Sequence, residues 1–98
     1  MPFLIVYMPD ARHHLREFSA AERVTILDSV DEMLVHEPTV ETRHRKALRS
    51  NLIAGWELRV GDFRVFYDVR GDDNVVAISA IGIKIHSRLV IGGEEVEL

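Results

Sequence analysis

The sequence predicts an α+β fold in which a helical hairpin packs on one face of a small, mainly antiparallel sheet. Three patterns indicate it: an apolar run at residues 3–8, a capping motif with helical periodicity at residues 19–36, and two alternating segments around a Gly61-Asp62 turn. The expected order of elements is β-α-α-β-β-β. A chain of 98 residues suits one domain, so we expect residues 1–98 to share a single core.

The chain should begin with a buried strand and a short helix. Residues 3–8 are rich in Ile, Val, Phe and Tyr and stop at Pro9, which is typical of a short buried strand. Asp10 is then expected to cap a helix whose apolar residues recur at intervals of four and three: Ala11, Leu15 and Phe18.

A second, longer helix should follow and pack antiparallel to the first. Ser19 and Glu22 match a capping box, in which each side chain bonds the backbone amide of the other residue. The apolar stripe of this helix is predicted to comprise Val24, Leu27, Val30 and Leu34, widened by Ile26 and Met33. Pro38 cannot continue a helix, so we expect the end near His36 or Glu37.

Residues 38–55 match neither period and are predicted to form a loop, which is long for so small a domain. Long loops in compact domains are often functional, and this one contains the densest basic stretch of the chain. We therefore take four of its residues as candidate nucleic-acid contacts: Arg43, Arg45, Lys46 and Arg49. The alternative is a solvated loop anchored to the core by Leu48 or Leu52.

Residues 56–60 and 63–69 alternate in polarity, and the two residues between them suit a hairpin turn. The core face is predicted to carry Trp56, Leu58, Val60, Phe63, Val65, Tyr67 and Val69. The opposite face is predicted to carry Glu57, Arg59, Arg64, Phe66 and Asp68. Residues 75–83 are apolar on both faces, as is typical of a central strand, and residues 89–96 allow a short C-terminal hairpin.

The formal net charge is −4, but the charges are unevenly distributed. Residues 1–42 carry eight acids and three arginines, whereas residues 43–88 carry nine bases and five acids; the tail adds Glu94, Glu95 and Glu97. An acidic chain can still present a local positive field, because physiological salt screens charges over about 8 Å. Scattered, solvated charges are the alternative interpretation.

The composition excludes several kinds of site. There are no cysteines, so neither disulfides nor thiolate chemistry are available, which suits a reducing compartment. The start of the chain lacks the basic region of a signal peptide, and no apolar run is long enough to span a membrane. We expect a cytoplasmic protein without membrane contacts. The five histidines lack metal-ligand spacing, so we predict no metal, and we predict no cofactor.

Two arginines are expected to face each other across the hairpin. The two-residue turn pairs Arg59 with Arg64, and like charges directly opposite destabilise a sheet. A local rule broken without compensation indicates a functional site, and two guanidinium groups at this spacing suit a phosphate or a carboxylate. Alternatively, Glu57 and Asp68 on the same face simply neutralise the arginines.

The central strand should complete this face. If it pairs Arg64 near Ala80, then Ala80, Gly82 and Lys84 lie on the arginine side of the sheet. Small residues beside cationic ones would leave a shallow positive concavity.

The segment from Trp56 to Val69 resembles the central hairpin of the RelE/ParE family of toxins from type II toxin–antitoxin systems. The flanking segments Lys46-Ala47-Leu48-Arg49 and Ala80-Ile81-Gly82-Ile83-Lys84 also resemble family segments. The resemblance implies a RelE/ParE-like fold and a cognate antitoxin, expected to be an acidic, amphipathic partner over the basic face and residues 89–91. The resemblance does not decide whether the chain forms a homo-oligomer.

The resemblance leaves three functions open. RelE-like members enter the ribosomal A site and cut messenger RNA without a metal, and we favour this endoribonuclease activity, with ribosome and mRNA as partners. ParE-like members inhibit DNA gyrase without chemistry. A degenerate member would bind its antitoxin and intoxicate nothing.

By position, the resemblance implies that Arg64 contacts the scissile phosphate, that Lys84 is a second cation and that Arg59 occupies a basic position of the hairpin. Glu57 stands where RelE-like toxins have a lysine, and their C-terminal stacking tyrosine has no counterpart. Glu57 as a base and His86 as an acid are candidates, as is a site in which neither acts. Loss of Arg64 is expected to cost little stability, because it relieves the repulsion with Arg59.

Overall fold

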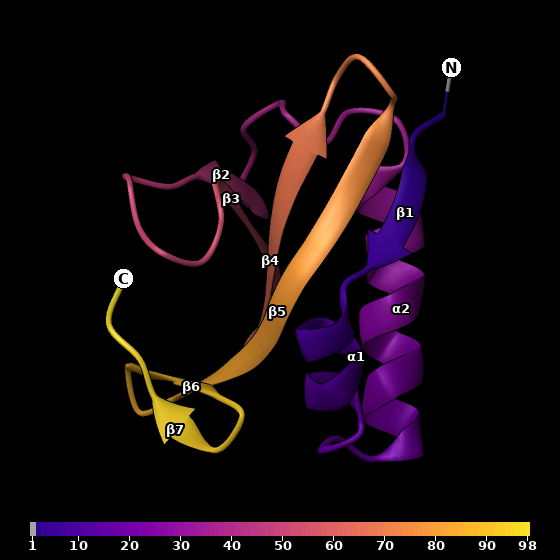
Figure 1. Cartoon of the computed structure of the whole chain (residues 1–98). Helices are drawn as coiled ribbons and strands as arrows, with labels where there is room; N and C mark the ends of the chain where they lie inside the picture. Colours follow the sequence, from indigo (N-terminus) through magenta and orange to yellow (C-terminus); the bar gives the residue numbers. More distant parts are fainter. Residues whose placement is uncertain (1) are drawn as a thin grey trace.

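The computed structural model describes residues 2–98, which form two helices and seven strands (Figure 1). The elements are β1 (Leu4–Tyr7), α1 (Pro9–Leu15), α2 (Ala20–Leu34), β2 (Arg45–Ala47), β3 (Trp56–Val60), β4 (Phe63–Arg70), β5 (Val75–Ile85), β6 (Arg88–Ile91) and β7 (Glu94–Glu95). Two helices packed on a mainly antiparallel sheet confirm the predicted fold class. Neither helix is long and apolar enough to cross a membrane.

The strands form one sheet in the order β2-β3-β4-β5-β6-β7, and all of these neighbours are antiparallel. β1 pairs in parallel with the first half of β5, and β6 pairs with its second half. β5 is therefore the central strand, as predicted. Figure 1 shows both helices on one side of the sheet, while the loop at residues 48–55 and the β6–β7 hairpin lie on the other side.

The starts of the two helices confirm one capping prediction and correct another. The Ser19 hydroxyl accepts a hydrogen bond from the Glu22 N–H at 3.2 Å, and the Glu22 carboxylate accepts one from the Ser19 N–H at 2.8 Å. The prediction for Asp10 is wrong, because α1 begins at Pro9 and Met8 takes the cap position without a side-chain hydrogen bond. Proline suits the first helical position, where its missing N–H has no intrahelical partner to lose.

The buried stripe of α2 differs in part from the prediction. Ile26, Val30 and Leu34 are fully buried at a spacing of four, whereas Val24 is 57% exposed. Two residues correspond to about 200° of rotation along a helix, so Val24 and Ile26 cannot both face the sheet. The helix ends at Leu34, slightly earlier than expected.

The segment predicted to be a loop contains an edge strand, β2, which pairs with β3. Three residues are too few for side-chain alternation to reveal a strand in the sequence. The rest of the loop is closed by Asn51, whose side chain accepts from the N–H groups of Ile53 and Ala54 and donates to the carbonyls of Arg49 and Ala54.

Both faces of the β3–β4 hairpin carry the predicted residues. On the helix side, Leu58, Val65 and Tyr67 are fully buried in the main core cluster. The other side has a second, smaller cluster that comprises Ala54, Phe66, Ala80 and Leu89. This face is therefore partly a core of its own, and Leu89 is covered by this chain rather than left for a partner.

β5 changes face at a β-bulge. The pairings Tyr67–Ile78 and Phe66–Ala80 leave Ser79 as an extra residue opposite β4. Before the bulge the even-numbered residues of β5 belong to the main core, and after it they face away from the helices.

Two tyrosines with buried hydroxyl groups differ in their hydrogen bonding. The Tyr67 hydroxyl donates to the Pro38 carbonyl at 2.7 Å, whereas the Tyr7 hydroxyl has no partner among the described residues. Burial, and to a lesser extent the nearby Asp31 carboxylate, raise the pKa of Tyr7 to about 12. The Tyr7 hydroxyl therefore stays protonated at neutral pH but contributes no hydrogen bond.

This difference predicts opposite responses to phenylalanine. Tyr67→Phe should lower the free energy of unfolding by about 1 kcal/mol, because the Pro38 carbonyl loses its donor. Tyr7→Phe should leave it unchanged or raise it by up to about 1 kcal/mol, because a buried unsatisfied group is removed. Urea denaturation of the two variants measures both effects. If both variants lost the same free energy of unfolding, the two tyrosine hydroxyl groups would not differ in hydrogen bonding as described.

Candidate anion-binding site

The two arginines lie opposite each other, as predicted. Arg59 of β3 is the direct partner of Arg64 of β4. On its other side Arg64 pairs with Gly82, two residues beyond the anticipated Ala80. A shift of two residues keeps the same face, so Gly82 and Lys84 do share the arginine side of the sheet.

A buried carboxylate lies between the two arginines. Glu57 is 5% exposed; its Oε1 accepts a hydrogen bond from Arg59 Nε at 2.8 Å and lies 3.9 Å from Arg64 Nε. Asp68 instead accepts from the Gly55 N–H. Of the two acids predicted to neutralise the arginines, Glu57 therefore does so and Asp68 does not. One carboxylate between two guanidinium groups compensates the repulsion and still leaves net positive charge.

Arg64 is held more firmly than an ordinary surface arginine. Its side chain is 13% exposed, and its Nη1 donates to the carbonyls of Gly61 at 2.7 Å and Phe63 at 2.9 Å. Its buried Nε has no hydrogen-bond partner among residues 2–98. Donors that are fixed before an anion arrives stabilise it without the cost of reorganisation.

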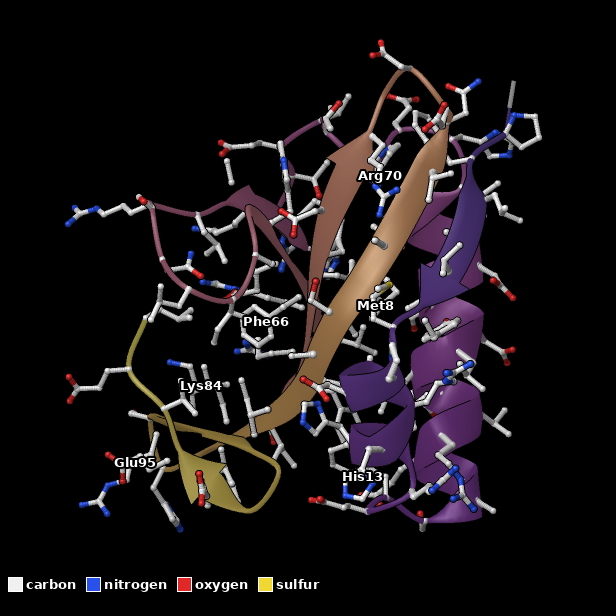
Figure 2. The ribbon with its side chains drawn as sticks, viewed as in Figure 1. Met8, His13, Phe66, Arg70, Lys84 and Glu95 are labelled. Atoms are coloured by element: carbon white, nitrogen blue, oxygen red, sulfur yellow. The ribbon has the colours of Figure 1, made fainter. Side chains whose placement is uncertain are left out.

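Arg59, Arg64 and Lys84 line one open cavity of about 630 Å³. Within the described part of the chain, no carboxylate lies within 4.0 Å of the Lys84 ammonium. Figure 2 shows Lys84 on the side of the sheet away from the helices. The cavity is completed by Asp62, Ile83, Ile85, His86 and Ser87.

The turn between β5 and β6 forms the lip of this cavity. His86 and Ser87 have φ values of 50° and 68°, in the left-handed region that side-chain-bearing residues rarely adopt. Hairpins of this kind prefer Asn-Gly, which would relieve the strain. The turn places the His86 side chain at the edge of the cavity.

Arg45 is separated from the cationic face, although it was predicted to contact nucleic acid. It pairs with Leu58 and so lies on the helix side of the sheet. Its Nε donates to the Val40 carbonyl and its Nη1 to the Met33 carbonyl, both at 2.8 Å. These bonds give Arg45 a structural role at the end of α2.

The other three basic residues of the stretch are exposed but dispersed. Lys46 pairs with Glu57 and therefore extends the cationic face. Arg43 precedes β2, and Arg49 lies in the loop at residues 48–55. The structure thus does not bring the four predicted contacts onto one surface.

Four residues that line the cavity were not predicted from the sequence: the apolar Ile83 and Ile85 and the polar Asp62 and Ser87. Asp62 could have been found, because it belongs to the predicted turn beside Arg64. Nothing marked Ser87, because a tight turn of two non-glycine residues has no sequence signature.

The cavity suits a phosphodiester. Its cations can donate to non-bridging oxygens, and guanidinium groups can do so in bidentate fashion. The His86 imidazole lies at the lip of the same cavity. Among residues 2–98, no group of three or more histidine, aspartate or glutamate side chains is arranged to hold a metal ion.

The fold is similar to that of three solved structures, two RelBE-type complexes and a free RelE toxin. The RelBE2 toxin–antitoxin complex of Mycobacterium tuberculosis matches with a TM-score of 0.69 and 22% identity, over 83% of this chain and 96% of that chain. The archaeal RelE–RelB complex of Pyrococcus horikoshii OT3 matches with a TM-score of 0.69 and 20% identity, over 88% and 99%. A mutant of the Escherichia coli toxin RelE in the free state matches with a TM-score of 0.53 and 17% identity, over 89% and 88%. At these identities the similarity shows a shared fold.

The sequence itself matches a family model. No curated protein matches the chain significantly. The model for the ParE toxin of the type II toxin–antitoxin system parDE matches residues 5–84, which include both helices, the β3–β4 hairpin and nearly all of β5. The chain therefore belongs to the RelE/ParE family of toxins of type II toxin–antitoxin systems.

Proposed function

We propose that this toxin is a ribosome-dependent endoribonuclease that cuts messenger RNA and so inhibits translation. The observation that carries the proposal is the cavity at which Arg59, Arg64 and Lys84 converge, with Arg64 fixed by backbone carbonyls. Such an array matches the charge that develops on a phosphodiester during cleavage. The ribosome would supply and position the message.

The proposed reaction is an internal attack within the RNA. The ribose 2′-hydroxyl gives its proton to a solvent water molecule, and its oxygen bonds to the adjacent phosphorus while the bond to the 5′-oxygen of the next nucleotide breaks. One product ends in a 2′,3′-cyclic phosphate, and the other begins with a 5′-hydroxyl group after its 5′-oxygen has been protonated. Arg64 and Lys84 stabilise the charge on the non-bridging oxygens, and the resemblance to RelE-like toxins implies that no metal takes part.

Glu57 and His86 take different roles in this proposal. Glu57 is buried and bonded to Arg59, so we assign it to positioning the two arginines rather than to proton transfer. His86 is exposed at the lip, so we assign it as the acid that protonates the leaving 5′-oxygen.

Expression of the toxin alone should arrest growth and halt protein synthesis before DNA replication. Pulse labelling of protein and DNA measures the order, and primer extension on a reporter message maps the cuts. Co-expression of the cognate antitoxin, which we expect to cover the cationic face, should restore growth and message integrity. Intact messages in arrested cells would contradict the proposal.

Inhibition of DNA gyrase is the second candidate. The matching family model favours it, because that model describes ParE, and so does the acidic net charge of −4. A supercoiling assay with purified gyrase separates the two: a gyrase inhibitor blocks supercoiling and leaves messages intact. A degenerate member would neither block supercoiling nor cut messages.

A further inference from the structure

The acidic C-terminal segment shares a cavity with the cations of the proposed site. A second cavity, of about 430 Å³, is lined on one side by Arg59 and Lys84 and on the other by Glu95, Glu97 and further residues of the last turn and tail. Arg59 and Lys84 also line the first cavity, so the two cavities adjoin. Figure 2 shows Lys84 and Glu95 on the same side of the molecule, away from the helices.

The segment is held in this place by backbone pairing and packing. Glu94 pairs with Ile91 and Glu95 pairs with Val90 across a tight Gly-Gly turn. The Val96 N–H donates to the Leu89 carbonyl at 2.9 Å, and the Val96 side chain packs against the second core cluster. Val96 anchors the backbone directly before Glu97, which lines the same cavity as Arg59 and Lys84.

The charges of the shared cavity are only partly neutralised by contact pairs: Glu57, which also lines the cavity, binds Arg59 at 2.8 Å. Glu95 lies 3.6 Å from Arg88, but no tail carboxylate among the described residues lies within 4.0 Å of Arg59 or Lys84. Carboxylates in the wall of one cavity still act on its cations, because the Debye length is about 8 Å at physiological ionic strength. They must also repel a phosphate that enters the cavity.

We propose that Glu97 is an affinity-determining residue that weakens the binding of RNA at this face by competing with phosphate for Arg59 and Lys84. The inference rests on the proposed function in that RNA is the polyanion bound here. RNA that extends from the first cavity into the second must overcome the negative charge of the tail. The toxin should therefore bind free RNA more weakly than a variant with a neutral side chain at position 97.

The test is the affinity of the full-length chain for a fluorescein-labelled single-stranded RNA of twelve nucleotides, measured by fluorescence anisotropy. Glu97→Gln should tighten binding by about two- to fivefold, as expected for one partly exposed charge interaction. Glu94→Gln is the matched control, because it changes the net charge equally but Glu94 does not line this cavity. Glu94→Gln should change the affinity by less than about 1.5-fold, since a charge outside the cavity is screened.

Two results would overturn the inference: equal gains in both variants, which indicate a general charge effect, or no gain in Glu97→Gln. The outcome is distinct from that of the endoribonuclease proposal, because binding is measured without cleavage. A gain confined to Glu97→Gln in a protein that cuts no message would retain this inference and refute the nuclease. Message cleavage by a toxin whose Glu97→Gln variant binds RNA no more tightly would refute this inference and retain the nuclease.

Discussion

Replacing Arg64 with alanine should lower the rate of ribosome-dependent message cleavage by two to three orders of magnitude. The guanidinium is fixed by the carbonyls of Gly61 and Phe63 at the cavity that we assign to the scissile phosphate. Negative charge on the phosphate oxygens grows as the new bond forms, so a fixed donor helps most in the transition state. Removal of one such donor typically costs about 3–4 kcal/mol of activation free energy.

The structure also changes the expected effect of this substitution on stability. From the sequence, Arg64→Ala was expected to change the free energy of unfolding little, because it relieves repulsion with Arg59. Glu57, however, already compensates that repulsion, and Arg64 is mostly buried. Its loss removes a cation near a buried carboxylate and two hydrogen bonds, so we expect the free energy of unfolding to fall by about 1–3 kcal/mol.

Activity and stability must therefore be measured together for this variant. Cleavage is assayed in a purified translation reaction at a temperature where urea denaturation shows the variant to be folded. Arg70→Ala is the matched control, because Arg70 is an exposed arginine at the end of the same strand. Full activity of folded Arg64→Ala, or an equal loss in Arg70→Ala, would refute the assignment of Arg64.

Gly82→Ala should be among the most destabilising single substitutions in the sheet. A Cβ atom at Gly82 would lie 2.5 Å from the Val90 carbonyl oxygen and 2.7 Å from Ile91 Cγ1. The oxygen belongs to the backbone of β6, so β5 and β6 would have to separate. We expect the free energy of unfolding to fall by about 2–3 kcal/mol, as for other overpacked sites.

Gly71→Ala is the control for this prediction. A Cβ atom there meets no heavy atom within 4 Å, and its φ lies outside the left-handed region. Alanine at such a site should be neutral or stabilise the protein by up to about 1 kcal/mol, because it restricts the unfolded chain. Urea denaturation of both variants decides the matter: a Gly82→Ala protein as stable as Gly71→Ala would show that β5 and β6 are not in close contact there.

Features that depend on neighbouring residues could be predicted from the sequence. The capping box of Ser19 and Glu22 joins residues three apart, so its geometry follows from the chain alone. The pairing of Arg59 with Arg64 follows from a two-residue turn in the same way. The same hairpin, with its flanking segments, carries the resemblance to the family, and the family model matches residues 5–84.

Contacts between residues far apart in the sequence could not be predicted and follow from the packing of the folded chain. The sequence allowed Glu57 to be a base or a neutralising group, and its burial against Arg59 favours a positioning role. Arg45 appeared as one of four equivalent basic residues until β2 paired with β3 and turned it toward the carbonyls of Met33 and Val40. Neither outcome depends on local periodicity, so no pattern could reveal it.

The bulge at Ser79 is the clearest example of a feature that the sequence alone does not reveal. Side chains alternate along a strand with a period of two, so one inserted residue reverses the face of every later residue. Ile78 can therefore fill the main core while Gly82 and Lys84, at even positions of the same strand, reach the cationic face. The sequence shows apolar residues on both faces of this strand, but only its pairing with β4 selects where the alternation is interrupted.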